Sequence, residues 1–374
     1  MLEVADIFRL YGDAYLQKFG RRMPPSHRRA LEDIRHCRTE VFGGHVYDCD
    51  RCGHRQYAYH SCKNRSCPKC QGNDTELWLQ KRHGELLAVP YFHLVFTLPK
   101  ELHPLVRRHQ KTLYGVLMKA AARSLMKLAA DPRYVGGRLG ILAVLHTWTT
   151  TLTYHPHAHL LVPAGGVSQD ERWVTARKDY LVPVQALSKI FRGMFLEMLR
   201  KALPRQLVPN SVWTKPWVVY CQPAVQGTEK VLKYLARYVH RVAFANSRLV
   251  RIADGQVTFR YRNRRQQQWE TMTLPATEFI RRFLQHVLPR GTHKVRYYGI
   301  WNPSQRAILR RVQLVTGSAQ IPSVMDDAET NQTDSTPEKT LPEKTFEKPR
   351  QCPCCGEGTL VLVETIPRHT RAPP

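Results

Sequence analysis

Two histidines placed two residues apart could bind a metal ion. His157 and His159 begin the segment His157 to Val162, whose branched apolar residues predict a β-strand. On a strand, side chains two residues apart leave the same face, so both imidazoles can share one cation. A lone histidine is usually structural, and an HxH pair alone is a short pattern. Pro156 cannot donate to a sheet ladder, so we expect it at a strand start or edge, near solvent.

Two tyrosines on a predicted helix could supply a nucleophile. Tyr234 and Tyr238 lie four residues apart in the helical stretch Thr228 to Val242 and therefore share one face. Both fall between an apolar stripe and a basic flank, where a phenol can attack a phosphate. The alternative, which the helix alone favours, is that each tyrosine only buries its ring and leaves its hydroxyl in water. Three residues of the basic flank are candidate contacts to DNA phosphates: Lys233, Arg237 and Arg241.

Most of the cysteines cluster near the N-terminus. Two CxxC knuckles, Cys49 to Cys52 and Cys67 to Cys70, are separated by fourteen residues, which lets four thiolates converge on one zinc ion. We predict that Cys49, Cys52, Cys67 and Cys70 bind a structural Zn²⁺ with no coordination position left for water or substrate. Five residues are candidate ligands of a second zinc, with core packing as the alternative for the cysteines: Cys37, Cys62, His45, His54 and His60.

A further group of cysteines lies near the C-terminus. The segment Cys352-Pro353-Cys354-Cys355-Gly356 looks like half of a zinc ribbon, with no second CxxC after it. It either borrows ligands from elsewhere, for instance His369 or Cys221, or is a vestige without metal. The missing second half favours the vestige.

Helices and strands must position these groups. Apolar residues at helical spacing predict helices over residues 4–19 and 25–34, which we expect to pack on the cysteine module. We predict an α+β fold class, with a helical, zinc-ribbon-like domain for DNA binding over residues 1–85 and a mixed region over 89–315. Further strands are expected over residues 91–98, 141–154, 157–162 and 217–221, and a further helix over 184–203.

The charge balance points to nucleic acid as the partner. Lys and Arg number 57 against 30 Asp and Glu, a net charge of +27 that favours polyanions. No apolar run is long enough for a membrane span and no signal segment is evident, so we predict a cytoplasmic protein without membrane contact. Clustered CxxC pairs then favour metal over disulfides. Residues 319–349 hold seven acidic residues and three lysines and predict a disordered acidic linker before a tail, 350–374.

Taken in order along the chain, these motifs resemble those of one family, the two-tyrosine HUH transposases, which move insertion sequences by a rolling-circle-like route. The first part is similar to that family's N-terminal zinc-binding domain, and the later part to its catalytic domain. The matching segments are Cys37-Arg38-Thr39, Gly43-Gly44-His45, Cys49 to Gly53, Ser61 to Gln71, Phe96 to Pro99, Tyr154 to Val162, Tyr234 to Asn246 and Arg296 to Gly299.

The resemblance implies a catalytic domain built on a central antiparallel sheet with flanking helices. The histidines would lie on a central strand, with the tyrosine helix beside it. His157 and His159 would bind Mg²⁺ or Mn²⁺, which polarises the scissile phosphate. Tyr234 or Tyr238 would attack single-stranded DNA at an insertion-sequence end, giving a 5′-phosphotyrosine and a free 3′-OH. The other tyrosine would then transfer that strand or cut another.

The sequence leaves several questions about this site open. A third metal ligand is usual in such sites, and a phenol with a pKa of about 10 needs activation that no residue here explains. One alternative is a non-catalytic zinc-dependent DNA-binding protein, or a decayed transposase, that only recognises element ends. Another is a phosphodiesterase that uses activated water and forms no covalent intermediate. Five residues are candidates for the third ligand: His146, His155, Gln222, Glu229 and His240.

Overall fold

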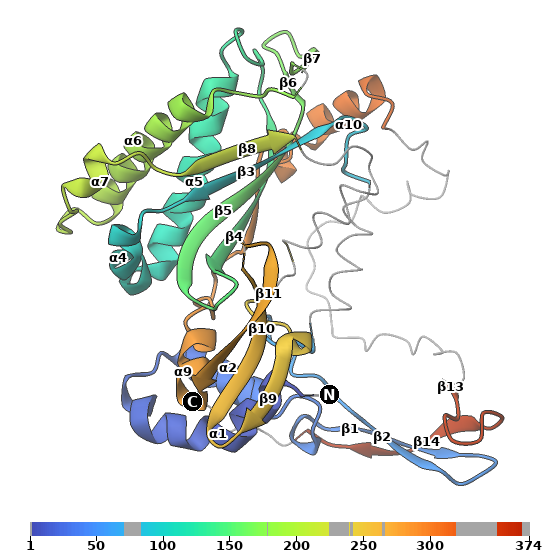
Figure 1. Cartoon of the computed structure of the whole chain (residues 1–374). Helices are drawn as coiled ribbons and strands as arrows, with labels where there is room; N and C mark the ends of the chain where they lie inside the picture. Colours follow the sequence, from blue (N-terminus) through green and yellow to red (C-terminus); the bar gives the residue numbers. More distant parts are fainter. Residues whose placement is uncertain are drawn as a thin grey trace, which may run out of the picture. The chain divides into compact units, whose positions relative to one another are not determined.

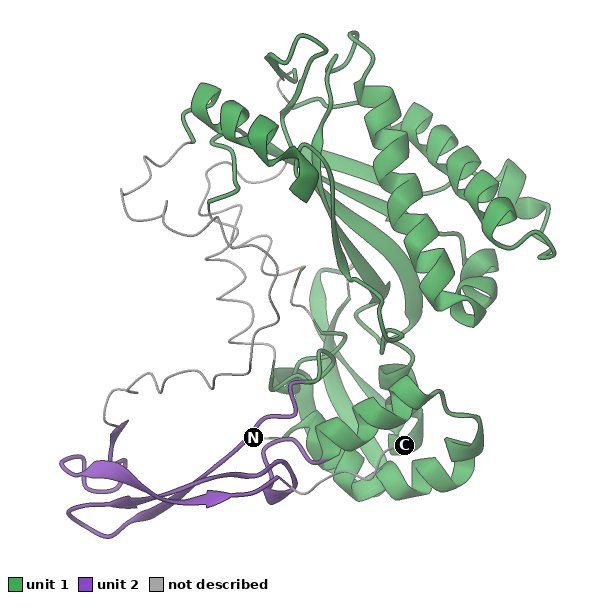
Figure 2. Cartoon of the chain, turned by 180° about the vertical axis from the view of Figure 1, so that it is seen from behind, with its two compact units in different colours: residues 1–35, 64–319 green, residues 36–63, 320–374 purple. Residues whose placement is uncertain are grey.

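A computed structural model describes residues 2–70, 84–177, 179–223, 239, 242–263, 266–318 and 350–368 of the chain. The chain divides into two compact units, one formed by residues 1–35 and 64–319 and the other by residues 36–63 and 320–374 (Figure 2). The expected domains, 1–85 and 89–315, follow a different division: the first 35 residues belong to the larger unit, and the C-terminal segment belongs with residues 36–63. The predicted linker, 319–349, lies outside the described residues.

A five-stranded antiparallel sheet is the centre of the larger unit. Its strands are β3 (Tyr91–Thr97), β4 (Gly140–Trp148), β5 (Tyr154–Pro163), β8 (Val219–Pro223) and β12 (Val295–Gly299). They lie in the order β12-β4-β5-β3-β8, and every neighbouring pair is antiparallel (Figure 1). The predicted α+β class with an antiparallel sheet is therefore confirmed, and β5, which carries both histidines, is the middle strand.

One face of this sheet is covered by two long helices, α5 (Gln110–Ala129) and α6 (Val184–Ala202) (Figure 1). Side chains of β5 alternate between the two faces. Tyr154, Ala158 and Leu160 are buried in the core beneath the helices. His157 and His159 therefore point to the other face, where they are half-buried. Burying each large apolar side chain of the core contributes about 1.5–3 kcal/mol.

A second apolar cluster lies on the histidine face and includes residues of α10 (Arg306–Val315). Val144 on β4 and Leu161 on β5 belong to this cluster. Val144 is also the cross-strand partner of His159. The sheet thus has apolar packing on both faces, and the histidines lie next to the packed part of the second face.

A turn over residues 149–153 joins β4 to β5, within the stretch 141–154 that the sequence predicted as strand. Side chains from other elements bind its backbone carbonyl oxygens. Arg282 donates to the Thr151 oxygen at 3.3 Å, and the Gln285 side-chain amide donates to the Leu152 oxygen at 2.8 Å. The hairpin that brings His146 opposite His157 is therefore held at its tip by polar contacts.

Pro156 lies on the central strand and is buried, contrary to the expectation of an exposed edge position. The pairing of β4 with β5 shifts register between His146 and Trp148, opposite His155 and Pro156. Where the pairing of the two strands is irregular, the ladder does not require a backbone N–H from every residue. Proline, which has no N–H, can therefore be accommodated there. The irregularity explains how a proline fits beside the histidines.

Helices α1 (Val4–Phe19), α2 (Pro25–Arg35) and α9 (Ala276–Leu284) pack together and share an aromatic contact. Helices α1 and α2 confirm the two predicted N-terminal helices; besides α9, they contact the loop of Cys67 and Cys70 through Glu3 and Asp33. Phe8 contacts Phe283 edge to face with ring centroids 5.4 Å apart. A three-stranded sheet lies in the order β11-β10-β9. The bounds of the further elements are η1 (Gly20–Arg22), η3 (Lys100–Leu102), α4 (His103–Arg108), β6 (Gly165–Val167), β7 (Trp173–Thr175), α7 (Ser211–Thr214), η4 (Asn246–Arg248), β9 (Leu249–Ala253), β10 (Gln256–Asn263), β11 (Gln268–Pro275) and η5 (Pro303–Gln305).

The smaller unit is a four-stranded sheet made from two distant parts of the chain. Its elements are η2 (Glu40–Phe42), β1 (Gly44–Cys49), β2 (Arg55–Tyr59), β13 (Arg350–Gln351) and β14 (Thr359–Ile366). The strand order is β13-β14-β1-β2, so β1 lies between its sequence neighbour and the C-terminal strand. Its buried apolar cluster consists of Cys49, Cys352 and Leu360, with Tyr47 and Cys355 packed beside it. So small a core cannot stabilise a fold without further help.

Candidate functional site

Three histidines, one buried and two half-buried, come together on the face of the hairpin β4–β5 that lies opposite α5 and α6. Strand pairing puts His146 directly opposite His157, and His159 follows two residues along β5. One nitrogen from each of these three rings lies within 4.8 Å of the others. His146, one of five open candidates from the sequence, is thus brought to the predicted pair. The three imidazoles can bind one divalent cation from one side and leave its other positions open.

Hydrogen bonds orient the two strand histidines. The Nδ1 of His157 lies 2.7 Å from the carbonyl oxygen of His155, and the Nδ1 of His159 lies 2.9 Å from the Nε2 of His93. In the neutral tautomer that donates through Nδ1, each ring keeps the lone pair of Nε2 for a metal. The His146 ring stacks on Trp148 with centroids 4.6 Å apart. Each ring of the triad therefore has a neighbour that restricts its rotation.

His93 on β3 was not recognised from the sequence. It is only 6% exposed, and its ring lies parallel to that of His159 with centroids 5.1 Å apart. Desolvation by burial lowers the pKa of His93 to about 4, so this ring is neutral at physiological pH and can accept the His159 proton. One sequence feature could have identified His93: it is the polar residue in the otherwise apolar run Tyr91 to Phe96. A buried histidine in such a run indicates a buried polar partner.

Other candidates for the third ligand lie elsewhere or outside the described residues. The His155 ring is 5.2 Å from that of His157 but does not belong to the triad. Gln222 lies on the edge strand β8, opposite His93 of β3. Strands β3 and β5 separate it from β4, and its side chain accepts a hydrogen bond from Tyr220. The other predicted site residues lie outside the described part of the chain: Glu229, Lys233, Tyr234, Arg237, Tyr238, His240 and Arg241.

One described residue of the tyrosine segment packs on the histidine face. Val239 has helical backbone geometry and is 5% exposed. It belongs to the same apolar cluster as Val144 and Leu161, and Val144 is the cross-strand partner of His159. Val239, the residue that follows Tyr238 in the sequence, is therefore packed on the sheet face that carries the triad.

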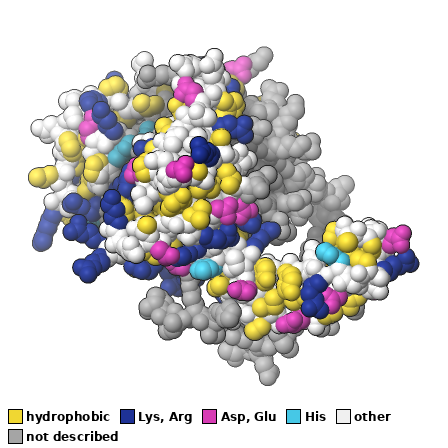
Figure 3. All heavy atoms as spheres, turned by 60° about the horizontal axis from the view of Figure 1, so that its bottom comes forward, with side chains coloured by type: hydrophobic (Ala, Val, Ile, Leu, Met, Phe, Trp, Pro, Cys, Tyr) yellow, Lys and Arg dark blue, Asp and Glu magenta, His cyan; other side chains and the backbone are white. Residues whose placement is uncertain are grey.

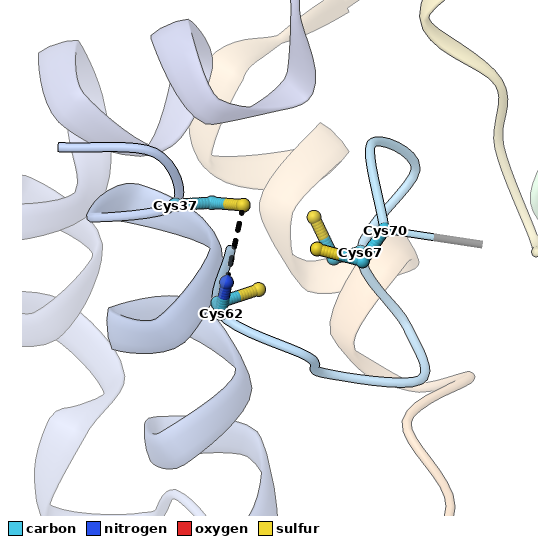
Figure 4. Close-up of side chains that lie close together, drawn as sticks. All are labelled: Cys37, Cys62, Cys67 and Cys70. Atoms are coloured by element: carbon cyan, nitrogen blue, oxygen red, sulfur yellow. Dashed lines mark hydrogen bonds between the residues drawn. The ribbon is translucent and has the colours of Figure 1, made fainter. Parts of the chain in front are cut away.

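Four cysteines of the N-terminal region form a compact thiol cluster. The sulfurs of Cys37, Cys62, Cys67 and Cys70 lie within 4.8 Å of one another and point toward a common centre (Figure 4). The backbone N–H of Cys62 donates to the sulfur of Cys37 at 3.5 Å. Four thiolates in this arrangement fit a tetrahedral structural zinc.

The loop that carries Cys67 and Cys70 is anchored by its own polar residues. The side-chain amide of Asn64 donates to Asp33 at 3.0 Å, and Lys69 forms an ion pair with Glu3 at 2.8 Å. Arg65 donates to the backbone oxygens of Leu288, Pro289 and Thr292. Two basic residues of this loop, Arg65 and Lys69, therefore have structural partners.

A second thiol cluster changes the predicted grouping of cysteines. Cys49 and Cys52 lie with Cys352 and Cys355, all four sulfurs within 4.8 Å. The knuckles of the predicted set Cys49, Cys52, Cys67 and Cys70 are thus divided between two clusters. CxxC spacing identifies a knuckle, but strand pairing between β1 and β14, far apart in sequence, decides which knuckles meet. Cys37 and Cys62, predicted for a second zinc, belong to the first cluster.

The suggested partners of the C-terminal cysteines are not part of that second cluster. Cys221 lies on β8 in the larger unit, where desolvation raises the pKa of its thiol to about 11. His369 lies outside the described residues. In contrast, backbone N–H groups of Glu357 and Gly358 lower the pKa of the Cys355 thiol to about 6, which favours the thiolate that metals bind.

A basic pocket of about 770 Å³ lies where α4 and α9 approach the start of β5. Lys100, Arg107 and Arg108 line one side, and Arg281 and Arg282 line the other. Hydrogen bonds from Arg281 and Arg282 lower the pKa of Glu278 to about 2, so Glu278 stays ionised and fixes both guanidinium groups. Thr153 and Tyr154 form part of the lining. The pocket therefore reaches the start of β5 from the side of Tyr154, which points to the sheet face opposite the triad.

Lys and Arg side chains also gather elsewhere on the larger unit, and Figure 3 shows many of them on its left side in that view. Within the described part of the chain, no helix is both long and apolar enough to cross a membrane.

Comparison with known proteins gives the class of this chain. A family model described as "Transposase zinc-binding domain" matches residues 7–98, and one described as "Putative transposase" matches residues 140–307. The second match contains β4, β5 and the histidine triad. The first contains the cluster of Cys37, Cys62, Cys67 and Cys70. No solved structure matches the chain.

Two curated relatives extend the match along the chain. "Putative transposase y4qJ" of Sinorhizobium fredii is 40% identical, over 99% of this chain and 97% of the relative. The "Transposase for insertion sequence element IS801" of Pseudomonas savastanoi pv. phaseolicola is 31% identical, over 70% of this chain and 67% of the relative. Transposases are enzymes that cleave and transfer DNA, and the matches to family models and relatives place this chain in that class of enzyme. The chain belongs to the insertion-sequence transposases of the IS91 and IS801 type that carry an N-terminal zinc-binding domain. The resemblance seen in the sequence is confirmed.

Proposed function

We propose that this transposase nicks single-stranded DNA at insertion-sequence ends and transfers the strand through a 5′-phosphotyrosine intermediate. The observation that carries the proposal is the triad of His146, His157 and His159, three imidazoles that meet on the sheet face opposite α5 and α6. A structural metal would have a closed ligand set, whereas three protein ligands leave positions for substrate oxygens.

The triad is suited to a divalent cation that accepts nitrogen donors. Bound there, Mg²⁺ or Mn²⁺ would polarise the scissile phosphate and stabilise its developing charge. Imidazole is a better ligand for transition-metal ions than for Mg²⁺, which prefers oxygen, so we expect Mn²⁺ to bind more tightly. The chain's own contribution is to hold three Nε2 or Nδ1 lone pairs at one point and to keep His159 oriented through His93.

Tyr234 and Tyr238 are the proposed nucleophiles. In the cleavage step, a tyrosine hydroxyl gives up its proton and its oxygen bonds to phosphorus, the bond from phosphorus to the 3′ oxygen breaks, and that oxygen takes up one proton to leave as a 3′-OH, so protons balance. Joining is the reverse attack by a 3′-OH, so no external energy source is needed. Val239 supports this assignment, because consecutive Cα atoms are about 3.8 Å apart and Val239 packs in the cluster on the triad's face.

Basic residues would hold the DNA strand on either side of the cut. Lys233, Arg237 and Arg241 lie on the same segment as the tyrosines and are proposed to bind phosphates next to the scissile one. The pocket between α4 and α9 would bind phosphates further along the strand, since it is lined by five cationic side chains and adjoins β5.

The test is covalent capture of DNA. Single-stranded oligonucleotides carrying the element ends are incubated with the full chain and Mn²⁺ or Mg²⁺, and products are separated on a denaturing gel. We expect a protein–DNA adduct that is lost in the double variant Tyr234→Phe/Tyr238→Phe and kept in Tyr180→Phe, a matched change at an exposed tyrosine.

Two results would reject the proposal. Binding of the ends without any adduct would indicate a protein that only recognises DNA. Cleavage without an adduct would indicate hydrolysis by activated water. Mass spectrometry of the adduct peptide identifies which tyrosine attacks.

A further inference from the structure

The two knuckles of the second thiol cluster have the same backbone geometry. In the first, the N–H of Gly53 donates to the Cys49 oxygen at 3.1 Å, and in the second, the N–H of Gly356 donates to the Cys352 oxygen at 2.9 Å. Both glycines have a positive φ, +66° and +69°. Cysteine pairs closed by a glycine in this conformation form the tight turn that presents two sulfurs to one metal. The C-terminal segment is therefore a complete knuckle rather than a vestige.

Backbone amides of both knuckles point at the sulfurs. The N–H groups of Arg51 and Cys52 lie 3.5 Å from the sulfur of Cys49. The N–H of Cys354 lies 3.4 Å from the Cys352 sulfur, and that of Gly358 lies 3.3 Å from the Cys355 sulfur. Such donors stabilise the anionic thiolate over the thiol. A thiolate that binds a metal needs such N–H donors, whereas a neutral buried thiol does not.

Distances between the sulfurs distinguish a metal site from a disulfide. The sulfurs of Cys49 and Cys355 are 3.7 Å apart, and those of Cys52 and Cys352 are also 3.7 Å apart. A disulfide would require about 2.05 Å. A tetrahedral zinc with bonds of about 2.3 Å separates its sulfurs by about 3.8 Å. The cluster has the dimensions of the zinc site.

Contacts around the knuckles fix one against the other. Asp50 donates its backbone N–H to the Thr359 oxygen at 3.2 Å, and its carboxylate accepts the Thr359 N–H at 2.8 Å. Arg51 and Glu357 form an ion pair at 2.8 Å. A side chain at Gly358 would collide with the sulfur of Cys49, so the close approach requires glycine there.

We propose that Cys49, Cys52, Cys352 and Cys355 bind a second structural Zn²⁺, completing a zinc ribbon whose two knuckles come from opposite ends of the chain. The match to the transposase zinc-binding domain ends at residue 98 and does not include the C-terminal knuckle. The cluster of Cys37, Cys62, Cys67 and Cys70 is the other zinc site. The full chain thus carries two structural zinc ions, and one of them ties β14 to β1.

Zinc content of the purified full chain tests this proposal. All variants are compared in a His157→Ala/His159→Ala background, which keeps zinc off the triad. We expect about two zinc ions per chain for the protein with unchanged cysteines and for Cys354→Ser, which alters an exposed cysteine of the same knuckle outside the cluster. Cys352→Ser/Cys355→Ser should retain about one zinc ion, and so should Cys62→Ser/Cys70→Ser. Two zinc ions in Cys352→Ser/Cys355→Ser, or one in the protein with unchanged cysteines, would overturn it.

A second experiment leaves every ligand in place. A protease site is inserted between residues 319 and 349, and the cleaved chain is passed through a size-exclusion column. The C-terminal fragment should elute with the rest of the protein when zinc is present and separate after a strong chelator is added. Separation in the presence of zinc, or no separation after complete zinc removal, would contradict a zinc-held ribbon.

Discussion

At the scale of single residues, the triad depends on a histidine that does not touch the metal position. His93 lies on β3, and its Nε2 is 2.9 Å from the Nδ1 of His159. A partner of this kind selects the tautomer of a ligand and fixes its ring, and its loss typically reduces metal affinity about 10–100-fold. His93 is therefore a positioning residue for the proposed centre.

Changing His93 should weaken metal binding without removing a ligand. We expect His93→Ala to lower the affinity for Mn²⁺ about 10-fold or more, as followed by calorimetry or by the paramagnetic signal of free Mn²⁺. His93→Gln should recover much of the loss, because its side-chain oxygen can accept the His159 proton. His155→Ala is the matched control and should bind as the unchanged protein does. Equal affinity in His93→Ala and the control would contradict the positioning role.

His286 predicts how stability depends on pH. Burial lowers the pKa of His286 to about 3, from 6.5, with smaller effects of the positive charges on Arg107 and His27. Its ring lies 3.1 Å from the Thr147 hydroxyl and 3.2 Å from the Leu152 oxygen near the tip of the hairpin. The Leu152 hydrogen bond raises the pKa, but desolvation outweighs it and keeps the ring neutral. Below pH 6.5, His286 of the unfolded chain binds a proton, whereas His286 of the folded chain stays neutral until the pH approaches 3. The free energy of unfolding should therefore fall as the pH falls from about 6.5 toward 3.

Denaturant unfolding at several pH values measures this effect. His286 alone could account for a loss of up to about 4 kcal/mol, since one pKa unit corresponds to about 1.4 kcal/mol. His286→Gln should show a shallower dependence on pH. It should not be flat, because burial also lowers the pKa values of His27 and His93 to about 4. The same slope in both proteins would show that His286 is protonated in the folded state.

At the scale of helices and strands, a comparison of Gly299 with Gly193 tests whether the last residue of β12 must be a glycine. Gly299 has φ +63°, and a side chain there would overlap the backbone oxygen of Leu139. Gly193 lies exposed within α6 with no atom near its missing side chain. We expect Gly299→Ala to lower the free energy of unfolding by at least about 2 kcal/mol. Gly193→Ala should raise it by about 0.5–1 kcal/mol. Denaturant titration measures both, and a tolerated Gly299→Ala would contradict the strand end described here.

Helix α4 should contribute to DNA binding through phosphate contacts. Arg107 and Arg108 are exposed in the basic pocket. Replacing both by Gln should weaken single-stranded DNA binding regardless of base sequence. It should also reduce the slope of log affinity against log salt by about 1.4, since each phosphate contact contributes about 0.7. Fluorescence anisotropy over a salt series measures both effects, with Arg205→Gln as a control outside the pocket. An unchanged slope would exclude this pocket from the DNA path.

Local patterns in the sequence were sufficient to predict many of these elements but not how distant ones meet. The apolar run from Tyr91 predicted β3, and the spacing of His157 and His159 predicted two ligands on one strand face. His146 was one candidate among five because only the turn over residues 149–153 sets the register of β4 against β5. Cys49 and Cys52 were grouped with the wrong knuckle for the same reason: short spacing is visible in the sequence, and pairing between β1 and β14 is not.

At the scale of the whole molecule, the two units differ in what stabilises them. The larger unit has an extensive apolar core under α5 and α6. The smaller unit buries three residues in its cluster, two of them cysteines. Zinc removal should therefore unfold the smaller unit and leave the five-stranded sheet intact.

Hydrogen exchange of the full chain with and without a strong chelator checks this difference. Amides of β1, β2 and β14 should lose protection when zinc is removed, because their fold depends on the metal. Amides of β3, β4 and β5 should keep most of theirs. Loss of protection throughout the chain would show that both units depend on zinc, and no loss anywhere would show that neither does.

The pairing of Cys49 with Cys355 also concerns how the protein is made. These residues are 306 positions apart, and ribosomes add about 5–20 residues per second. The first knuckle therefore leaves the ribosome roughly 15–60 s before the second has been synthesised. During that interval, β1 can pair only with β2, and two thiols lack the other half of the proposed metal site. A chain that stopped at residue 349 would carry the histidine triad and both tyrosines but could not close the ribbon, so the proposed zinc site forms only after Cys352 and Cys355 have been synthesised.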